Sequence, residues 1–265
     1  MNIGHNNKKI IQEIGNGKKD HFDELNNSDE LSDQQQMQIN ILQKIVKTRL
    51  INKNNIFFTN INIISLGENC IGRVIPTRWG IIKTKEFGRL SMPFDLAVHF
   101  GESLCRILDD EFEEYSKCEN LFYEKDWRCW KNLKYRVTYN HDTDLGVDDI
   151  DKLSKRYRDR VENFINVLKN GKKTFFIYSM FKSDFSDFNL LIKMLHKYNN
   201  NFHIIILNHR ALEITNSNPM ITVIDCPFPS NDYIWHDATH YATQAGFEFE
   251  NNIIDNMINI IQNKT

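Results

Sequence analysis

Four short segments of the chain consist almost entirely of apolar residues, and stretches with helical spacing separate them. The apolar runs lie near 61–66, 174–179, 203–207 and 221–224. Apolar residues three and four positions apart predict helices over 148–168 and 188–198, and a final helix that starts near Phe247. Strands that lack polar alternation are typical of parallel sheets that are buried on both faces. The pattern therefore predicts an α/β fold, a three-layer sandwich in which helices cover a mainly parallel sheet.

The N-terminal part of the chain differs in character from the rest. Residues 1–30 are rich in Asn, Lys, Asp and Gly, and they contain too few apolar side chains to offset the entropy lost on ordering. We therefore expect a disordered tail there. Residues 31–55 are predicted to be an amphipathic helix, from Leu31 to Ile51, followed by a linker; this helix would pack on the domain or dock a partner. Residues 56–265 form the predicted α/β domain.

Composition and charge exclude several classes of function. The chain of 265 residues carries 33 basic and 35 acidic residues, so its formal charge of −2 gives no electrostatic reason to expect a nucleic acid partner. Because we find neither an apolar run that could cross a bilayer nor an N-terminal apolar signal segment, we expect a cytoplasmic protein. Five cysteines without a C-x-x-C pair suit a reducing compartment. Cys and His show no metal-ligand spacing, so we expect neither a metal nor another cofactor.

The most informative position is Cys70, which follows the first predicted strand and the strand-ending Gly67 and lies at the start of a helix. Ligands of open α/β sheets usually bind at the carboxyl ends of the strands. Backbone N–H groups and the dipole at the start of a helix favour a thiolate, which is the nucleophilic form of cysteine. We therefore predict that Cys70 is a partly exposed nucleophile, although a free cysteine is also a common core residue. Backbone N–H groups of Cys70 and Ile71, with Asn69 as a further donor, would stabilise an oxyanion.

Three further polar residues are candidates for binding a substrate near this point. Arg73 follows Cys70 on the predicted helix and could face an anionic group. Asp95 lies at the end of a short strand expected within 87–96, where it either caps the next helix or reaches toward Cys70. Asn208 follows the strand predicted near 203–207. The predicted oxyanion and substrate-binding set is Gly67, Asn69, Ile71, Arg73, Asp95 and Asn208.

Two pairs of histidine and aspartate could supply a general base. Asp237 and His240 are three residues apart before the final helix, a spacing at which the carboxylate can hold the imidazole Nδ1–H and leave Nε2 to accept a proton. His141 and Asp142 follow a strand predicted over 135–139, in a segment whose Asn, Asp and Gly residues also favour a turn. We favour His240 with Asp237, because Asp142 is adjacent to His141 and would point elsewhere if the strand continues. His141 is then the alternative base.

Two families resemble the chain in these residues. Cys70 after the first strand, with Asp237 and His240 before the last helix, resembles the SGNH hydrolase superfamily, with Cys in place of the usual Ser. This resemblance implies an SGNH/flavodoxin-like sheet. The stretches SLGENC, SMPFD and YNHD, with the helix before FFIYSM, resemble an uncharacterised bacterial family described as putative papain-like cysteine peptidases. The second resemblance covers most of residues 61–210, and it implies Cys70 as nucleophile and His141 as a candidate base.

Together, these features predict a hydrolase or acyl transferase with a cysteine nucleophile. Cys70 would attack the carbonyl of an ester, thioester or amide, and His240, held by Asp237, would take and return the proton. The substrate would be a small molecule, a glycan or a peptide. The alternative is a non-catalytic module that binds a sugar or nucleotide in the same crevice, with Arg73, Arg78 and Arg89 near an anionic group.

Overall fold

The computed structural model describes most of the chain from residue 60 onward. The described residues are 37, 60–85, 88–182, 184–210, 212–214 and 218–265. The tail predicted over 1–30 lies outside them, and so does the helix and linker predicted over 31–55, apart from Met37.

The described residues belong to two compact units. The larger unit contains Asn60–Arg73, Leu90–Asp225 and Asn263–Thr265. The smaller unit contains Val74–Arg89 and Cys226–Gln262. Cys70 and His141 therefore lie in the larger unit, whereas His240 lies in the smaller one.

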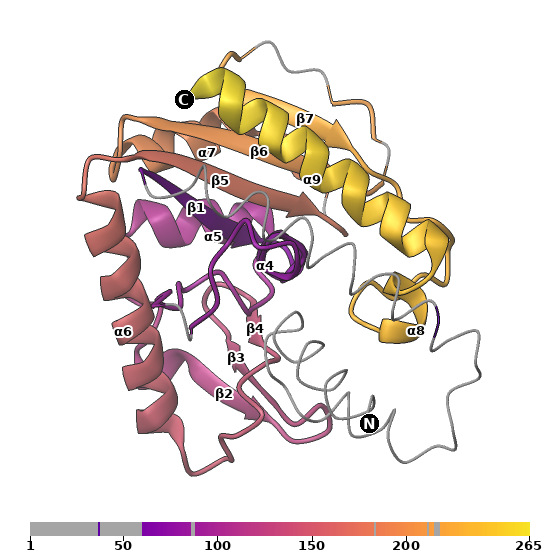
Figure 1. Cartoon of the computed structure of the whole chain (residues 1–265). Coiled ribbons are helices and arrows are strands. Elements are labelled where there is room, and N and C mark those ends of the chain that lie inside the picture. Colours follow the sequence, from indigo (N-terminus) through magenta and orange to yellow (C-terminus); the bar gives the residue numbers. More distant parts are fainter. Residues whose placement is uncertain (1–36, 38–59, 86–87, 183, 211, 215–217) are drawn as a thin grey trace. The chain divides into compact units, whose positions relative to one another are not determined.

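A four-stranded parallel sheet, in the order β1-β5-β6-β7, forms the centre of the larger unit (Figure 1). Its strands are β1 (Ile61–Gly67), β5 (Lys173–Met180), β6 (Phe202–Asn208) and β7 (Ile221–Asp225). The four strands predicted from the apolar runs are confirmed, and each extends one or two residues beyond the predicted bounds. Every residue of β6 is buried, which explains why its sequence shows no polar alternation.

Helices flank this sheet, as the α/β pattern predicts. In the larger unit they are α5 (Gly101–Asp109), α6 (Ile150–Leu168) and α7 (Phe188–His196), and their apolar side chains share one core with the sheet. The strand residues in this core alternate along each strand and lie in register across the sheet, as in the row Ile64, Phe176 and Ile204. The predictions over 148–168 and 188–198 are confirmed, with α7 two residues shorter than expected at its end.

A small antiparallel sheet, in the order β2-β3-β4, precedes α6 in the chain (Figure 1). Its strands are β2 (Leu121–Glu124), β3 (Cys129–Asn132) and β4 (Val137–Tyr139), and the 3₁₀ turn η2 (Cys118–Asn120) leads into β2. The strand predicted over 135–139 contains β4. The sequence did not predict β2 and β3, because four residues are too few to establish a period of two.

The segment before α5 differs from its prediction. Among the described residues 88–96 there is no strand, and residues 93–96 form turns. The helix begins at Gly101 rather than at Asp95, with Phe100 as its N-cap residue. The prediction of a strand that ends at Asp95 is therefore wrong, because Pro93 starts a turn instead of ending an extended segment.

The smaller unit contains most of α4 (Ile71–Arg78), together with α8 (Ala238–Tyr241) and nearly all of α9 (Gln244–Lys264). Its interior holds a buried ion pair between Arg78 and Glu250, to which the Trp79 indole adds a hydrogen bond of 2.6 Å. Burial raises the pKa of Glu250, while Arg78 and Trp79 act in the opposite direction. None of the helices in the described part of the chain is long and apolar enough to cross a membrane.

Candidate active site

Cys70 and His141 meet although 71 positions separate them in the chain. The Sγ atom of Cys70 lies 3.1 Å from Nε2 of His141. Cys70 occupies the turn between β1 and α4, and His141 occupies the turn that follows β4. At this distance a proton can pass between the thiol and the imidazole, which is the basic requirement for an activated cysteine nucleophile.

A short extended segment, residues 97–99, connects the two elements that carry this pair. Val98 exchanges backbone hydrogen bonds of 2.9 and 3.3 Å with Thr138 of β4. The N–H of His99 donates to the carbonyl of Glu68, immediately after β1, at 3.3 Å. The segment therefore ties the small sheet to the end of β1, and this arrangement brings the turn after β4 toward Cys70.

Gly67 allows the same segment to approach closely. Its φ of +99° lies in the left-handed region, and a Cβ atom at this position would be 3.1 Å from the carbonyl oxygen of His99. A side chain here would be strained and crowded at once. The sequence predicted Gly67 as part of the oxyanion and substrate-binding set; the structure gives it a role in backbone packing.

Asp142, which the sequence paired with His141 only as the alternative, anchors the turn to α6. Its Oδ1 accepts hydrogen bonds from Arg156 at 2.7 Å and from Arg160 at 3.2 Å, and its Oδ2 accepts one from the Tyr157 hydroxyl at 2.7 Å. Burial raises the pKa of Tyr157 well above its ordinary value, so this hydroxyl stays a donor. Both carboxylate oxygens are thus engaged by α6, and Asp142 holds the backbone beside His141 in place.

Glu68, which the sequence analysis did not single out, has a buried carboxylate beside the candidate nucleophile. Its Oε1 accepts a hydrogen bond from the Tyr178 hydroxyl at 3.0 Å. Its Oε2 accepts from the backbone N–H groups of Phe181 at 3.0 Å and Lys182 at 2.6 Å. Glu68 therefore connects the end of β1 to the segment that follows β5.

Asn69 lies at one end of a chain of hydrogen bonds across three strand ends. Its Oδ1 accepts from the backbone N–H of Ile71 at 3.0 Å and from the Ser179 hydroxyl at 3.1 Å. Nε2 of His209, just after β6, lies 3.1 Å from the same hydroxyl. Among the residues that the structure describes, the buried Nδ2 atom of Asn69 has no hydrogen-bond partner. This places a buried, unpaired donor group on the residue next to Cys70.

The backbone at Ile71 is not an open oxyanion donor. Its N–H already donates to Asn69 Oδ1, so the predicted role of this N–H is wrong in the structure as it stands. The reason is local, because a helix leaves its first N–H groups without partners and a nearby side-chain oxygen accepts one of them. Asn69, by contrast, keeps its predicted place beside Cys70.

Arg73 and Asp95 form a buried pair in the larger unit. Arg73 Nε lies 3.6 Å from Asp95 Oδ2, and these side chains are 6% and 2% exposed. Asp95 Oδ2 also accepts the backbone N–H of Met92 at 2.9 Å. Asp95 thus stabilises a turn and faces Arg73 on α4, so neither side chain stands alone as a site for a substrate charge.

Asn208 lies at the end of β6, where the sequence predicted a binding residue, but its hydrogen bonds run to β7 and to the segment after β6. Its Nδ2 donates to the carboxylate of Asp225 on β7 at 2.7 Å and to the carbonyl of Leu212 at 2.9 Å. Its Oδ1 accepts the Leu212 N–H at 3.3 Å. Asn208 therefore joins β6 to β7, and its neighbour His209 points to Ser179 instead.

His240 and Asp237 lie in the smaller unit, and the bond expected between them is replaced by local contacts. In the described structure, Asp237 Oδ1 accepts from the N–H and the hydroxyl of Thr239, at 2.8 and 2.7 Å, as a cap of α8. His240 Nδ1 accepts the Ile234 N–H at 3.3 Å. A Nδ1 that accepts carries no proton, so neutral His240 is protonated at Nε2, which is the wrong tautomer for a base acting through Nε2.

Burial distinguishes the cysteines less than the sequence suggested. Cys70 is 5% exposed, so the expectation of partial exposure is wrong; the thiol lies in a turn that packs between a buried strand and a buried helix start. Cys226 is also buried, at 1%. Cys118 is the more accessible thiol, with intermediate exposure. Reactivity at Cys70 would therefore have to come from its partner His141 rather than from exposure.

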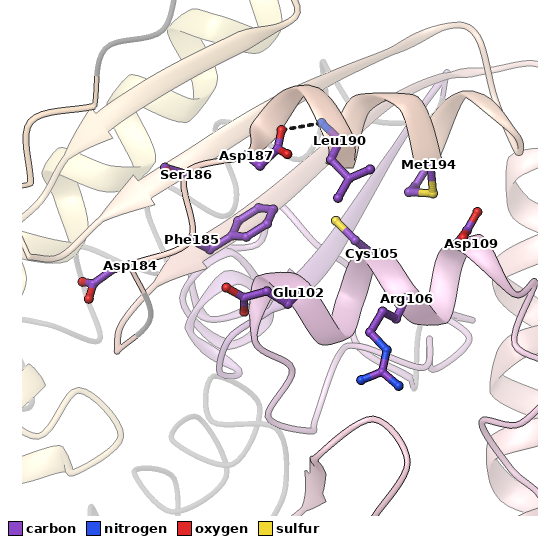
Figure 2. Close-up of a pocket in the computed structure, with 10 residues that line it drawn as sticks. All are labelled: Glu102, Cys105, Arg106, Asp109, Asp184, Phe185, Ser186, Asp187, Leu190 and Met194. Carbon is purple, nitrogen blue, oxygen red and sulfur yellow. Dashed lines mark hydrogen bonds between the residues drawn. The ribbon is translucent and has the colours of Figure 1, made fainter.

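A pocket with a volume of about 360 Å³ lies between α5 and α7 in the larger unit (Figure 2). Cys105 from α5 and Leu190 from α7 point toward one another across it. Burial, with the charges of Asp187, Glu102 and Asp109, raises the pKa of Cys105 to about 12. This thiol therefore stays protonated at neutral pH, and none of the site residues predicted from the sequence lines the pocket.

Among the described residues, no group of three or more His, Cys, Asp or Glu side chains could hold a metal ion. Searches against protein-family models, curated proteins and solved structures found no significant match.

Proposed function

We propose that the protein is a hydrolase or acyl transferase in which Cys70 is the nucleophile and His141 the general base. The observation that carries this proposal is the 3.1 Å contact between Cys70 Sγ and His141 Nε2. Three arrangements support it. Cys70 lies at the carboxyl end of a parallel strand, and Asp142 fixes the turn that bears His141. Asn69, which directly precedes Cys70, has a buried Nδ2 donor without a partner among the described residues.

In the first half of the reaction, His141 Nε2 accepts the thiol proton and Cys70 Sγ attacks the carbonyl carbon of the substrate. A C–S bond forms while the carbonyl π electrons move to the oxygen. The tetrahedral intermediate then collapses, the bond to the leaving group breaks, and the imidazolium gives its proton to that group. In the second half, His141 removes a proton from water or another acceptor, which attacks the acyl carbon. The C–S bond then breaks, the acyl group leaves with the acceptor, and the imidazolium returns its proton to Cys70 Sγ.

The developing oxyanion needs hydrogen-bond donors that are in place before the reaction. The Asn69 carboxamide meets this requirement, because its oxygen is held by Ile71 and Ser179 and its buried Nδ2 has no acceptor among the described residues. A buried NH₂ group without an acceptor costs on the order of 1–3 kcal/mol, so its presence calls for an explanation. An acyl oxygen bound at this point during catalysis would supply the missing acceptor.

The resemblance to the putative papain-like cysteine peptidases agrees with this pairing, because it also implies Cys70 and His141. The proposal includes an SGNH/flavodoxin-like three-layer arrangement around the parallel sheet. It also includes a cytoplasmic location and a small-molecule, glycan or peptide substrate that carries an ester, thioester or amide.

Two reagents applied to the full-length protein test the nucleophile. Iodoacetamide alkylates a thiolate at a saturated carbon, whereas p-nitrophenyl acetate acylates it and releases p-nitrophenolate. We expect both to modify Cys70 at neutral pH well before Cys105, which is comparably buried at 3%, as located by mass spectrometry of the digested protein. Cys70→Ser should abolish the burst of p-nitrophenolate.

Equal slow labelling of Cys70 and Cys105 would contradict the proposal. Cys70 would then be a core cysteine, and the non-catalytic binding module would become the better description.

A further inference from the structure

The carboxyl edge of the parallel sheet carries a hydrogen-bond chain that leads from His209 to the residue beside Cys70. The chain runs from His209 Nε2 to Ser179 Oγ, and from there to Asn69 Oδ1, with a distance of 3.1 Å at each step. His209 and Ser179 are 5% and 0% exposed. Three neighbouring strands therefore contribute to one buried polar network that ends at the candidate nucleophile.

The directions of these hydrogen bonds follow from which groups can donate. The Ile71 N–H can only donate, so the oxygen of the Asn69 carboxamide must face it. That oxygen can only accept, so the single hydrogen of the Ser179 hydroxyl must point to Asn69. His209 Nε2 must then donate to Ser179 Oγ and carry a proton. Each group in the chain thus sets the direction of the next.

The result is a carboxamide with only one orientation. Two donors hold Oδ1 of Asn69, so its NH₂ group must point the opposite way, where the described residues offer it no acceptor. Rotating the amide by 180° would place its NH₂ group against the Ile71 N–H, a repulsive contact between two donors. It would also oblige the Ser179 hydroxyl to turn and His209 to change tautomer. A fixed donor stabilises a developing charge better than one that must reorient during the reaction.

We infer that Ser179 and His209 are positioning residues, which hold the Asn69 carboxamide so that its Nδ2 donates to the acyl oxygen at Cys70. This inference rests on the proposed acyl-transfer function. It assigns roles to two residues that act on the reaction through the Asn69 carboxamide. His209 acts on the reaction only through Ser179 and Asn69.

The two reagents used above distinguish positioning of the oxyanion donor from a merely structural role of His209. Acylation by p-nitrophenyl acetate passes through a tetrahedral oxyanion, whereas alkylation by iodoacetamide does not. We expect His209→Leu to lower the saturating acylation rate constant about tenfold, with little change in the ester concentration that gives half saturation. Alkylation of Cys70 should stay within about twofold of the unmodified protein. Asn69→Ala, which removes the donor itself, should cost about 10²–10³ in acylation.

Two further variants and one control keep the test decisive. His209→Gln retains an N–H donor near the position of Nε2 and should restore most of the acylation rate. In the Asn69→Ala background, His209→Leu should have no further effect on acylation, because its influence passes through Asn69. His196→Gln replaces an exposed histidine on α7 and is the matched control.

Failure of the inference and failure of the proposed function give different results. If neither reagent modifies Cys70 preferentially in the unmodified protein, the proposed function fails. The inference alone is overturned if Cys70 reacts as proposed and His209→Leu acylates normally. It is also overturned if His209→Leu slows alkylation as much as acylation, or slows acylation equally when Asn69 is absent.

Discussion

The hydroxyl of Tyr157 donates a hydrogen bond of 2.7 Å to Asp142, the residue that follows His141 in the chain. Tyr157 lies on α6, which also contributes Arg156 and Arg160 to the same carboxylate. The Asp142 side chain is 1% exposed. The helix therefore fixes the turn that presents His141 to Cys70, although no residue of α6 has a proposed part in the chemistry.

Asp142→Asn should destabilise the protein by about 3 kcal/mol or more, because it leaves the guanidinium of Arg160, which is 10% exposed, without its carboxylate. Asp144→Asn is the matched control, since Asp144 pairs with the same Arg156 but is 62% exposed, and its loss should cost about 0–1 kcal/mol. Urea unfolding of the two variants measures the difference. Similar costs for both would show that the buried cluster is not what holds this turn.

His141→Ala should lower the acylation of Cys70 by p-nitrophenyl acetate about 10²–10⁴-fold, the range typical for loss of a general base. His240→Ala should leave the rate within about twofold, because Nδ1 of His240 is an acceptor for the Ile234 N–H. Stopped-flow measurement of p-nitrophenolate release compares them directly. The opposite ranking would return the base to His240, as the D-x-x-H spacing first suggested.

Gly101→Ala should destabilise the protein by about 1–3 kcal/mol through overpacking. A Cβ atom at position 101 would lie 2.0 Å from Cγ of Phe185, whose ring lines the pocket between α5 and α7. Thermal or urea unfolding should show the loss, and it should shrink in a Phe185→Leu background. A stabilised Gly101→Ala variant would mean that the ring moves away at little cost, since Ala otherwise favours a helix.

Acid should weaken the fold in part through His99. Burial lowers the pKa of His99 to about 3, with an opposing contribution from the Ala97 carbonyl, whereas its ordinary value is 6.5. Between these two values the unfolded chain binds a proton that the folded chain does not, so stability is full above pH 6.5 and falls as the pH drops toward 3. The slope from this one group is at most about 1.4 kcal/mol per pH unit.

His99→Gln should therefore reduce the slope of the unfolding free energy against pH between pH 6 and 4, by up to about 1.4 kcal/mol per pH unit. This holds even if the variant is less stable at pH 7. Urea unfolding at several pH values gives the slope for each variant. His196→Gln, at an exposed position, serves as the reference. An unchanged slope in His99→Gln would assign the acid sensitivity to other groups.

The sequence by itself determined the strands of the parallel sheet and the helices between them. Burial on both faces makes a strand continuously apolar, and burial on one face gives a helix its periodicity, so each element leaves a local pattern in the chain. The position of Cys70 after β1, at the start of α4, follows from these patterns. Asn69 directly precedes Cys70 in the chain, so the sequence located it at the same turn.

Only the tertiary structure decided which histidine meets Cys70. That contact depends on β2 and β3, which are too short to show a period, and on the pairing of Val98 with Thr138. The bonds between Asp142 and α6 were equally hidden from the sequence. Its partners lie 14 to 18 positions further along the chain, and no local motif links them to Asp142. His209 and Ser179 reach Asn69 across adjacent parallel strands, whose order no sequence pattern encodes. Such contacts arise from packing between distant segments, and so the sequence placed Cys70 after the first strand but favoured His240 over His141 as its partner.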